Sequence, residues 1–177
     1  MGALPEMTAI LEVVTEGPEE TQELGRTLGS LLRGGEVAYL VGALGSGKTC
    51  LTQGIAWGVG VKEYARSPTF VLVGQYQGRL TFYHIDLYRV ESAAEALDLG
   101  LEEYLPGRGV SVVEWADPAP EGLAPEHLRI EISVLGPEPR RLRLVPLGAR
   151  YEALVESLRR ALSPKSRALQ PGPGEPR

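Results

Sequence analysis

The chain contains no asparagine and only one cysteine, Cys50. A single cysteine excludes an intrachain disulfide framework and a cysteine-rich metal site. The absence of asparagine excludes the Asn-Lys-x-Asp motif with which GTPases usually read their base. No apolar run reaches the length that crosses a bilayer, and the first residues lack the charged-then-apolar pattern of a signal peptide. We therefore expect a cytoplasmic protein without a membrane partner.

Positive charge is scarce as well. The sequence has 18 Lys and Arg against 23 Asp and Glu, a net charge of -5 at pH 7, which argues against a surface built as a whole to bind polyanions. The length of 177 residues suits one domain with a sizeable core. We expect residues 1–162 to form this single domain. Residues 163–177 are rich in proline and lack apolar periodicity, which predicts a disordered tail.

The most informative feature present is the segment Gly42–Thr49, which fits the phosphate-binding pattern G-x-x-x-x-G-K-[ST]. An apolar, strand-like run at 36–41 precedes it, and residues 49–58 have helical spacing. Glycines allow backbone N–H groups to approach a polyphosphate, and the helix start adds partial positive charge. The lysine ammonium suits the β- and γ-phosphate oxygens, and the threonine hydroxyl suits Mg²⁺. The predicted binding residues are Gly45, Ser46, Gly47, Lys48, Thr49 and Cys50.

The remaining pattern predicts an α/β fold. Strand-like runs lie at 8–15, 70–77, 80–86, 110–115, 128–134 and 140–145, and helical patterns at 18–33, 91–105 and 150–162. We expect a P-loop NTPase-like mixed sheet, with parallel strands next to the phosphate loop, two antiparallel hairpins, and helices on both faces. A phosphate loop at the carboxyl ends of parallel strands fits the general rule for open α/β sheets.

Two apolar strands each end in a carboxylate, Asp86 after Phe-Tyr-His-Ile and Glu114 after Val-Ser-Val-Val. A nucleotide-hydrolysing site needs a carboxylate at a strand end to hold Mg²⁺ or its waters. Solvated strand ends are the alternative interpretation. The sequence does not decide which carboxylate binds the metal directly, and both could share one cation. Together with Lys48, they are the candidate catalytic residues.

Three further side chains have two interpretations each. Thr69, in Ser67-Pro-Thr69, could contact a γ-phosphate or an attacking water, or it could belong to an ordinary turn. Cys50 lies in the first helix turn, where a thiol pKa can be lowered, although a small buried residue is the simpler interpretation. His84 lies on the same strand face as Asp86, and a lone strand histidine is commonly packed and hydrogen-bonded.

These residues together resemble the TsaE family, the ATPase of bacterial tRNA threonylcarbamoyladenosine biosynthesis. The motifs that carry the resemblance follow in the family's order: Gly42-x-Leu-Gly-Ser-Gly-Lys-Thr49, Ser67-Pro-Thr69, His84-Ile-Asp-Leu-Tyr-Arg89 and Glu114-Trp115. The resemblance covers residues 8–160. Ala43 is a departure, because the family often has an acidic residue there.

The resemblance implies weak ATP hydrolysis by the chain alone, with ATP and Mg²⁺ as cofactors. It implies that the chain works with TsaB and TsaD, which modify the adenosine beside the anticodon in tRNAs reading codons that start with A; tRNA contact would be indirect, through the complex. By motif, Lys48 would bind phosphates, and Thr49 and Glu114 would ligate Mg²⁺. Asp86 would assist at the metal or orient water, and Thr21 would lie near the nucleotide.

Two other functions use the same loop. A small-molecule kinase usually adds an arginine-bearing lid and an acceptor pocket, whereas most arginines near the carboxyl end fall in an alternating hairpin and the last helix. A nucleotide-gated binding module would bind without relevant turnover. Phosphate release from ATP, with and without partners and acceptors, distinguishes the three.

Overall fold

Strand β2 (Val37–Val41) reads Val-Ala-Tyr-Leu-Val, and its first four residues are buried. A strand without a polar position needs cover on both faces, as central parallel strands have. The computed structural model describes residues 9–65, 73–87, 90, 92–105, 107–115 and 124–168. In it, β2 is the middle strand and pairs in parallel with β5 (Val110–Trp115) on one side and β6 (His127–Val134) on the other.

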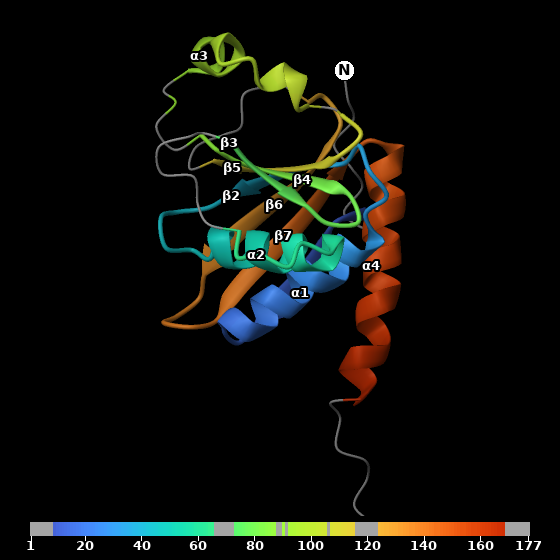
Figure 1. The fold of residues 1–177 in the computed structure, drawn as a ribbon. Coiled ribbons are helices and arrows are strands. Elements are labelled where there is room, and N and C mark those ends of the chain that lie inside the picture. Colours follow the sequence, from blue (N-terminus) through green and yellow to red (C-terminus); the bar gives the residue numbers. More distant parts are fainter. Residues whose placement is uncertain are drawn as a thin grey trace, which may run out of the picture.

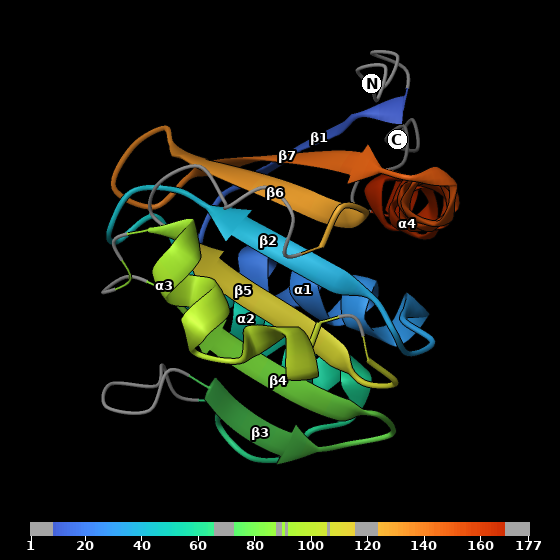
Figure 2. The ribbon, with the colours of Figure 1, turned by 90° about the horizontal axis from the view of Figure 1, so that it is seen from above.

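The described strands form one seven-stranded sheet in the order β1-β7-β6-β2-β5-β4-β3 (Figure 2). Strand β4 (Thr81–Asp86) runs parallel to β5 and forms an antiparallel hairpin with β3 (Val73–Gln77). Strand β7 (Arg140–Leu147) is antiparallel to both β6 and β1 (Leu11–Thr15). The predicted mixed sheet, with a parallel core and two antiparallel hairpins, is therefore confirmed.

Helices cover both faces of this sheet (Figure 1). Helices α1 (Pro18–Leu31) and α2 (Lys48–Val59) lie on one face, and the short α3 (Ala93–Asp98) and the 3-10 helix η2 (Leu101–Glu103) lie on the other. The last helix, α4 (Ala149–Ala168), packs against β7 and α1. Each face has its own apolar core, so side chains alternate between two cores along the central strands.

The contact between α1 and α2 is unusually close because each helix presents two glycines to the other. They are Gly25 and Gly29 in α1, and Gly54 and Gly58 in α2. A Cβ atom at Gly54 would lie 2.1 Å from the Gln22 carbonyl oxygen, and one at Gly29 would lie 2.2 Å from that of Ile55. No side chain fits at these distances, so the backbones themselves are in contact. Since α2 starts at the phosphate loop, this contact fixes the direction in which the loop helix points.

The prediction of a single helix over residues 91–105 is wrong, because the structure has two short elements there. Helix α3 ends at Asp98, the chain turns at Leu99 and Gly100, and η2 follows as a separate short element. Gly100 has φ of +71°, a left-handed conformation that ends a helix rather than continuing it. The break lets Leu101 and Leu105 turn into the core on this face of the sheet.

The end of α4 also differs from the expectation. The helix continues to Ala168 instead of ending at Leu162, and the Ser163 hydroxyl donates to the Arg159 carbonyl oxygen at 2.9 Å. The last turns of α4 extend beyond the sheet (Figure 1). Because apolar periodicity in a sequence reflects burial of one helix face, the apolar pattern ends before the helix does. The rest of the predicted tail, residues 169–177, lies outside the described residues. Within the described part of the chain, no helix is long and apolar enough to cross a membrane.

Candidate functional site

The phosphate loop connects β2 to α2 at the carboxyl edge of the parallel strands. Gly45 and Gly47 have φ of +78° and +106°, values that residues with a side chain rarely adopt. A Cβ atom built at either glycine would meet no atom within 4 Å, so the space beside this part of the loop is open. Gly42 is different, since its Cβ would lie 2.6 Å from the Ser46 hydroxyl oxygen and 2.9 Å from the Ile132 carbonyl oxygen. The loop is therefore closely packed at its base and open at its tip.

Positive charge gathers at the start of α2. The Lys48 ammonium donates to the Gly42 carbonyl oxygen at 2.5 Å and to that of Ala43 at 3.2 Å, which holds it against the loop. Gly47 caps α2, and its N-terminus has no side-chain cap hydrogen bond among the described contacts. The first N–H groups of a helix lack intrahelical partners and carry partial positive charge. The arrangement suits an anion with several oxygens, such as a polyphosphate.

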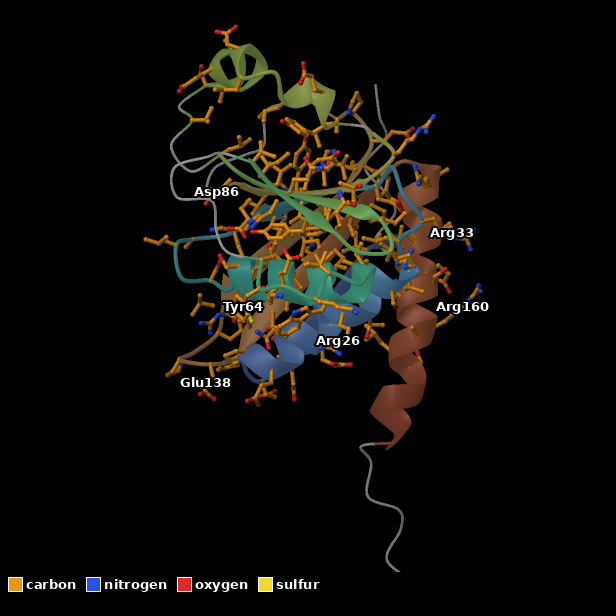
Figure 3. The ribbon with its side chains drawn as sticks, in the orientation of Figure 1. Arg26, Arg33, Tyr64, Asp86, Glu138 and Arg160 are labelled. Carbon is orange, nitrogen blue, oxygen red and sulfur yellow. The ribbon has the colours of Figure 1, made fainter. Side chains whose placement is uncertain are left out.

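The two predicted carboxylates meet at this edge. Asp86 and Glu114 are paired residues of the parallel strands β4 and β5, so both side chains project to the same face, that of α2. Figure 3 shows Asp86 at the end of the sheet where the phosphate loop lies. The structure thus brings together Thr49, Asp86 and Glu114, the three residues predicted to act at a metal.

Glu114 is the more deeply placed of the pair, with 4% of its surface exposed. Its Oε1 atom lies 2.8 Å from His84 Nε2 and 2.9 Å from the Thr52 hydroxyl oxygen. Its Oε2 atom lies 3.5 Å from the Thr49 hydroxyl, at the outer limit of a hydrogen bond. The two oxygens differ in role: one is held by the protein interior, and the other faces the loop threonine.

The donor set fits magnesium that arrives with a nucleotide. Among the described residues, no three His, Cys, Asp or Glu side chains form a metal site by themselves. Mg²⁺ is usually bound through one or two carboxylates plus phosphate oxygens and water, rather than by a cage of protein ligands. The 3.5 Å gap between Glu114 Oε2 and the exposed Thr49 hydroxyl leaves both oxygens available to a shared ligand.

Two other predicted residues have partners inside the protein. Thr21 is buried, and its hydroxyl lies 2.7 Å from that of Thr15 and 3.3 Å from the Gly17 carbonyl oxygen, which braces the start of α1. The Cys50 thiol donates to the Pro18 carbonyl oxygen at 3.1 Å. A role of either residue at a nucleotide remains a prediction. Thr69 and the rest of the Ser67-Pro-Thr motif lie outside the described residues, as does Arg89.

Of the two interpretations of Cys50, the structure does not favour a lowered thiol pKa. Burial raises the pKa of this thiol, and the opposing influences of the Arg140 charge and the Gln22 backbone are smaller. The simpler interpretation of Cys50, as a small packed residue, agrees with its contact to Pro18 across the interface of α2 and α1.

Sequence reasoning missed two residues of the site. Thr52 follows the phosphate-loop motif by one helical turn, so it could have been found from the spacing alone. Arg140, at the start of β7, donates from Nε to the Ser46 carbonyl oxygen at 2.9 Å and from Nη1 to the Gly136 and Pro139 carbonyl oxygens of its own hairpin. It lies 94 positions from Ser46, and no local pattern predicts such a contact. Through Arg140, the β6–β7 hairpin supports the phosphate loop.

The fold and this site define the class of the protein: an α/β protein with a P-loop NTPase-like sheet. The family model for "Threonylcarbamoyl adenosine biosynthesis protein TsaE" matches residues 15–142. The chain belongs to the TsaE family, as its motifs predict.

Individual relatives agree with this assignment. The protein named "tRNA threonylcarbamoyladenosine biosynthesis protein TsaE" from Bacillus subtilis (strain 168) is 42% identical over 147 residues, covering 82% of this chain and 92% of the relative. The protein of the same name from Treponema pallidum (strain Nichols) is 40% identical over 125 residues, covering 71% and 93%. A crystal structure described as Bacillus subtilus YdiB superposes with a TM-score of 0.74 at 36% identity, covering 87% of this chain and 97% of that one.

Proposed function

We propose that the protein is a magnesium-dependent ATPase that supports the threonylcarbamoylation of adenosine 37 in tRNAs reading codons that start with A. One observation carries the hydrolytic part: an open phosphate loop with a lysine and a threonine lies beside a buried carboxylate at the end of the neighbouring strand. The biosynthetic part is supported by family membership and by the names of the relatives.

The loop side of the site binds and orients the nucleotide. The Lys48 ammonium exchanges its contacts with the loop carbonyl oxygens for the β- and γ-phosphate oxygens, which accept stronger charge-assisted hydrogen bonds. The backbone N–H groups at the start of α2 hold the same oxygens. ATP is then fixed with its terminal phosphate close to the edge of the sheet, where β4 and β5 end.

The sheet side of the site supplies the carboxylates. The Thr49 hydroxyl and Glu114 Oε2 would hold Mg²⁺, which when bound neutralises charge on the phosphates during transfer. Asp86, which pairs with Glu114 in the strand register, would orient the attacking water or a metal-bound water. Catalysis of phosphoryl transfer is mostly positioning and electrostatic stabilisation, and these three side chains would supply both.

The proposed partners are inferred from membership of the family and not from a feature of this chain's surface. TsaB- and TsaD-like proteins would carry out the transfer to tRNA, and the ATPase would support repeated turnover. The tRNA would be reached through that complex, in keeping with the net charge of -5. Weak hydrolysis by the isolated chain is expected under this proposal.

The test is phosphate release from ATP by the purified protein, alone, with TsaB and TsaD partners, and with a panel of phosphoryl acceptors. Release that requires Mg²⁺ and increases with the partners supports the proposal. A phosphorylated acceptor formed together with ADP would identify a kinase instead. ATP binding without release under any condition would identify a nucleotide-gated module.

A further inference from the structure

The two oxygens of the Glu114 carboxylate have separate surroundings. Oε1 is 2.8 Å from His84 Nε2 on the adjacent strand β4 and 2.9 Å from the Thr52 hydroxyl on α2. Among the described residues, Oε2 contacts only the Thr49 hydroxyl, at 3.5 Å. A glutamate has three rotatable side-chain bonds, and holding one oxygen on two elements removes most of that freedom.

His84 is fully buried, and the described structure gives its ring a single hydrogen-bond partner. Its Nε2 atom contacts Glu114, while its buried Nδ1 atom has no partner among the described residues. Buried polar atoms are normally paired, and an apolar side chain could fill the same space without leaving a nitrogen unpartnered. The contact with Glu114 is therefore the feature that accounts for a histidine at this position. A ring with its hydrogen on Nε2 donates to the carboxylate and leaves a lone pair, rather than an N–H, unpartnered on Nδ1.

Thr52 connects the same oxygen to the phosphate loop. Its hydroxyl lies 2.9 Å from Glu114 Oε1 and 2.8 Å from the Lys48 carbonyl oxygen, and its single proton is shared between these two acceptors. Lys48 is the last residue of the loop before Thr49. The orientation of Glu114 is thus tied both to β4 and to the first turn of α2.

We propose that His84 is a positioning residue, which together with Thr52 holds Glu114 Oε1 so that Oε2 is presented to the magnesium of a bound nucleotide. This inference rests on the proposed function. Groups that orient metal ligands typically change metal affinity or activity by roughly 10- to 100-fold when they are removed. His84 touches neither nucleotide nor metal in this scheme and acts through Glu114 alone.

The direct test measures binding of a non-hydrolysable ATP analogue by titration calorimetry, with Mg²⁺ and with EDTA. The variants are His84→Leu, which removes the donor, and His84→Gln, which keeps an amide donor at a similar reach. In the wild type, Mg²⁺ should increase the affinity for the analogue. We expect this Mg²⁺-dependent increase to be roughly tenfold smaller in His84→Leu, whereas the affinity for the metal-free analogue should equal that of the wild type. His84→Gln should recover most of the loss.

A double-mutant cycle with Glu114→Gln separates positioning from general packing. If His84 acts through the carboxylate, His84→Leu has no further effect on the gain from Mg²⁺ once Glu114→Gln is present. Thr52→Val, which keeps the side-chain shape, should reduce that gain in the same way. Unfolding curves of each variant show whether it folds. If His84→Leu does not fold, Thr52→Val still tests whether the contacts of Glu114 Oε1 matter, because it removes the contact that comes from α2. The ¹⁵N shifts of the His84 ring should show the hydrogen on Nε2.

The outcomes are distinct for the two proposals. If the wild type gains no affinity from Mg²⁺, the proposed function is overturned and this inference with it. If the wild type gains affinity and His84→Leu or Thr52→Val keeps all of that gain, only the positioning role is overturned. The positioning role also fails if His84→Leu reduces the gain equally with and without Glu114→Gln.

Discussion

Asp86 and Glu114 stand opposite each other as paired residues of two parallel strands, with both side chains on the face that α2 covers. They are not equivalent. Glu114 is buried and held by His84 and Thr52, whereas Asp86 is half-buried nearer the rim of the sheet. Two neighbouring carboxylates repel each other unless a cation lies between or beside them. Under the proposed function, a divalent cation at this edge would relieve that repulsion, with the buried Glu114 as its ligand and Asp86 assisting.

The first prediction concerns this pair. Glu114→Gln keeps the side-chain shape but removes the negative charge, so Mg²⁺-dependent turnover should fall by at least about tenfold, while affinity for metal-free nucleotide changes little. Turnover and nucleotide binding are measured on the same preparation. Glu103→Gln is the matched control, since Glu103 is exposed on the opposite face of the sheet. Full activity in Glu114→Gln would remove this residue from the site.

The second prediction concerns Lys48. Replacing it with alanine removes the charge-assisted contacts to the phosphates, which should weaken ATP binding by about 1.5–3 kcal/mol, or roughly 10- to 150-fold. Calorimetry gives the dissociation constant directly. Lys62→Ala removes the same charge from an exposed position beyond α2 and should leave binding unchanged. An equal effect of the two substitutions would mean that net charge, rather than the loop, attracts the nucleotide.

The third prediction concerns the contact between α1 and α2. A Cβ atom at Gly54 or Gly58 would lie 2.1 or 2.2 Å from a carbonyl oxygen of α1, so the helices must separate to admit it. We expect Gly54→Ala and Gly58→Ala each to lower the free energy of unfolding by more than about 2 kcal/mol, measured by urea denaturation. At Gly107 the nearest atom would be 3.4 Å away. Gly107→Ala should therefore cost under about 0.5 kcal/mol, and an equally stable Gly54→Ala would show that the helices are not in close contact.

The fourth prediction concerns the thiol of Cys50. Because burial raises its pKa, the reactive thiolate is scarcer at pH 8 than for an unperturbed cysteine. Iodoacetamide should modify the folded protein more slowly than the urea-unfolded protein, and the rate should keep rising as the pH passes 9. Mass spectrometry of quenched samples gives the rates. A rate that levels off below pH 8.5 would indicate a lowered pKa and would contradict this account.

Much of the fold was predictable because local patterns report burial. The continuous apolar run of β2 and the alternation in β6 and β7 gave the correct strand types, and Pro18 marked the start of α1. The errors fell where periodicity and backbone conformation diverge. One is the left-handed turn at Gly100 between α3 and η2, and the other is the end of α4 beyond its buried face.

The sequence by itself determined the phosphate loop, because the conformations of Gly45 and Gly47 and the charge of Lys48 are properties of adjacent residues. It also determined that carboxylates end β4 and β5. Only the tertiary structure decided how Glu114 is held, since that depends on His84 and Thr52 reaching one of its oxygens from different elements. The same holds for Arg140 on the loop and for the glycines between α1 and α2. Such contacts join residues that are distant in the chain, and no local periodicity records them.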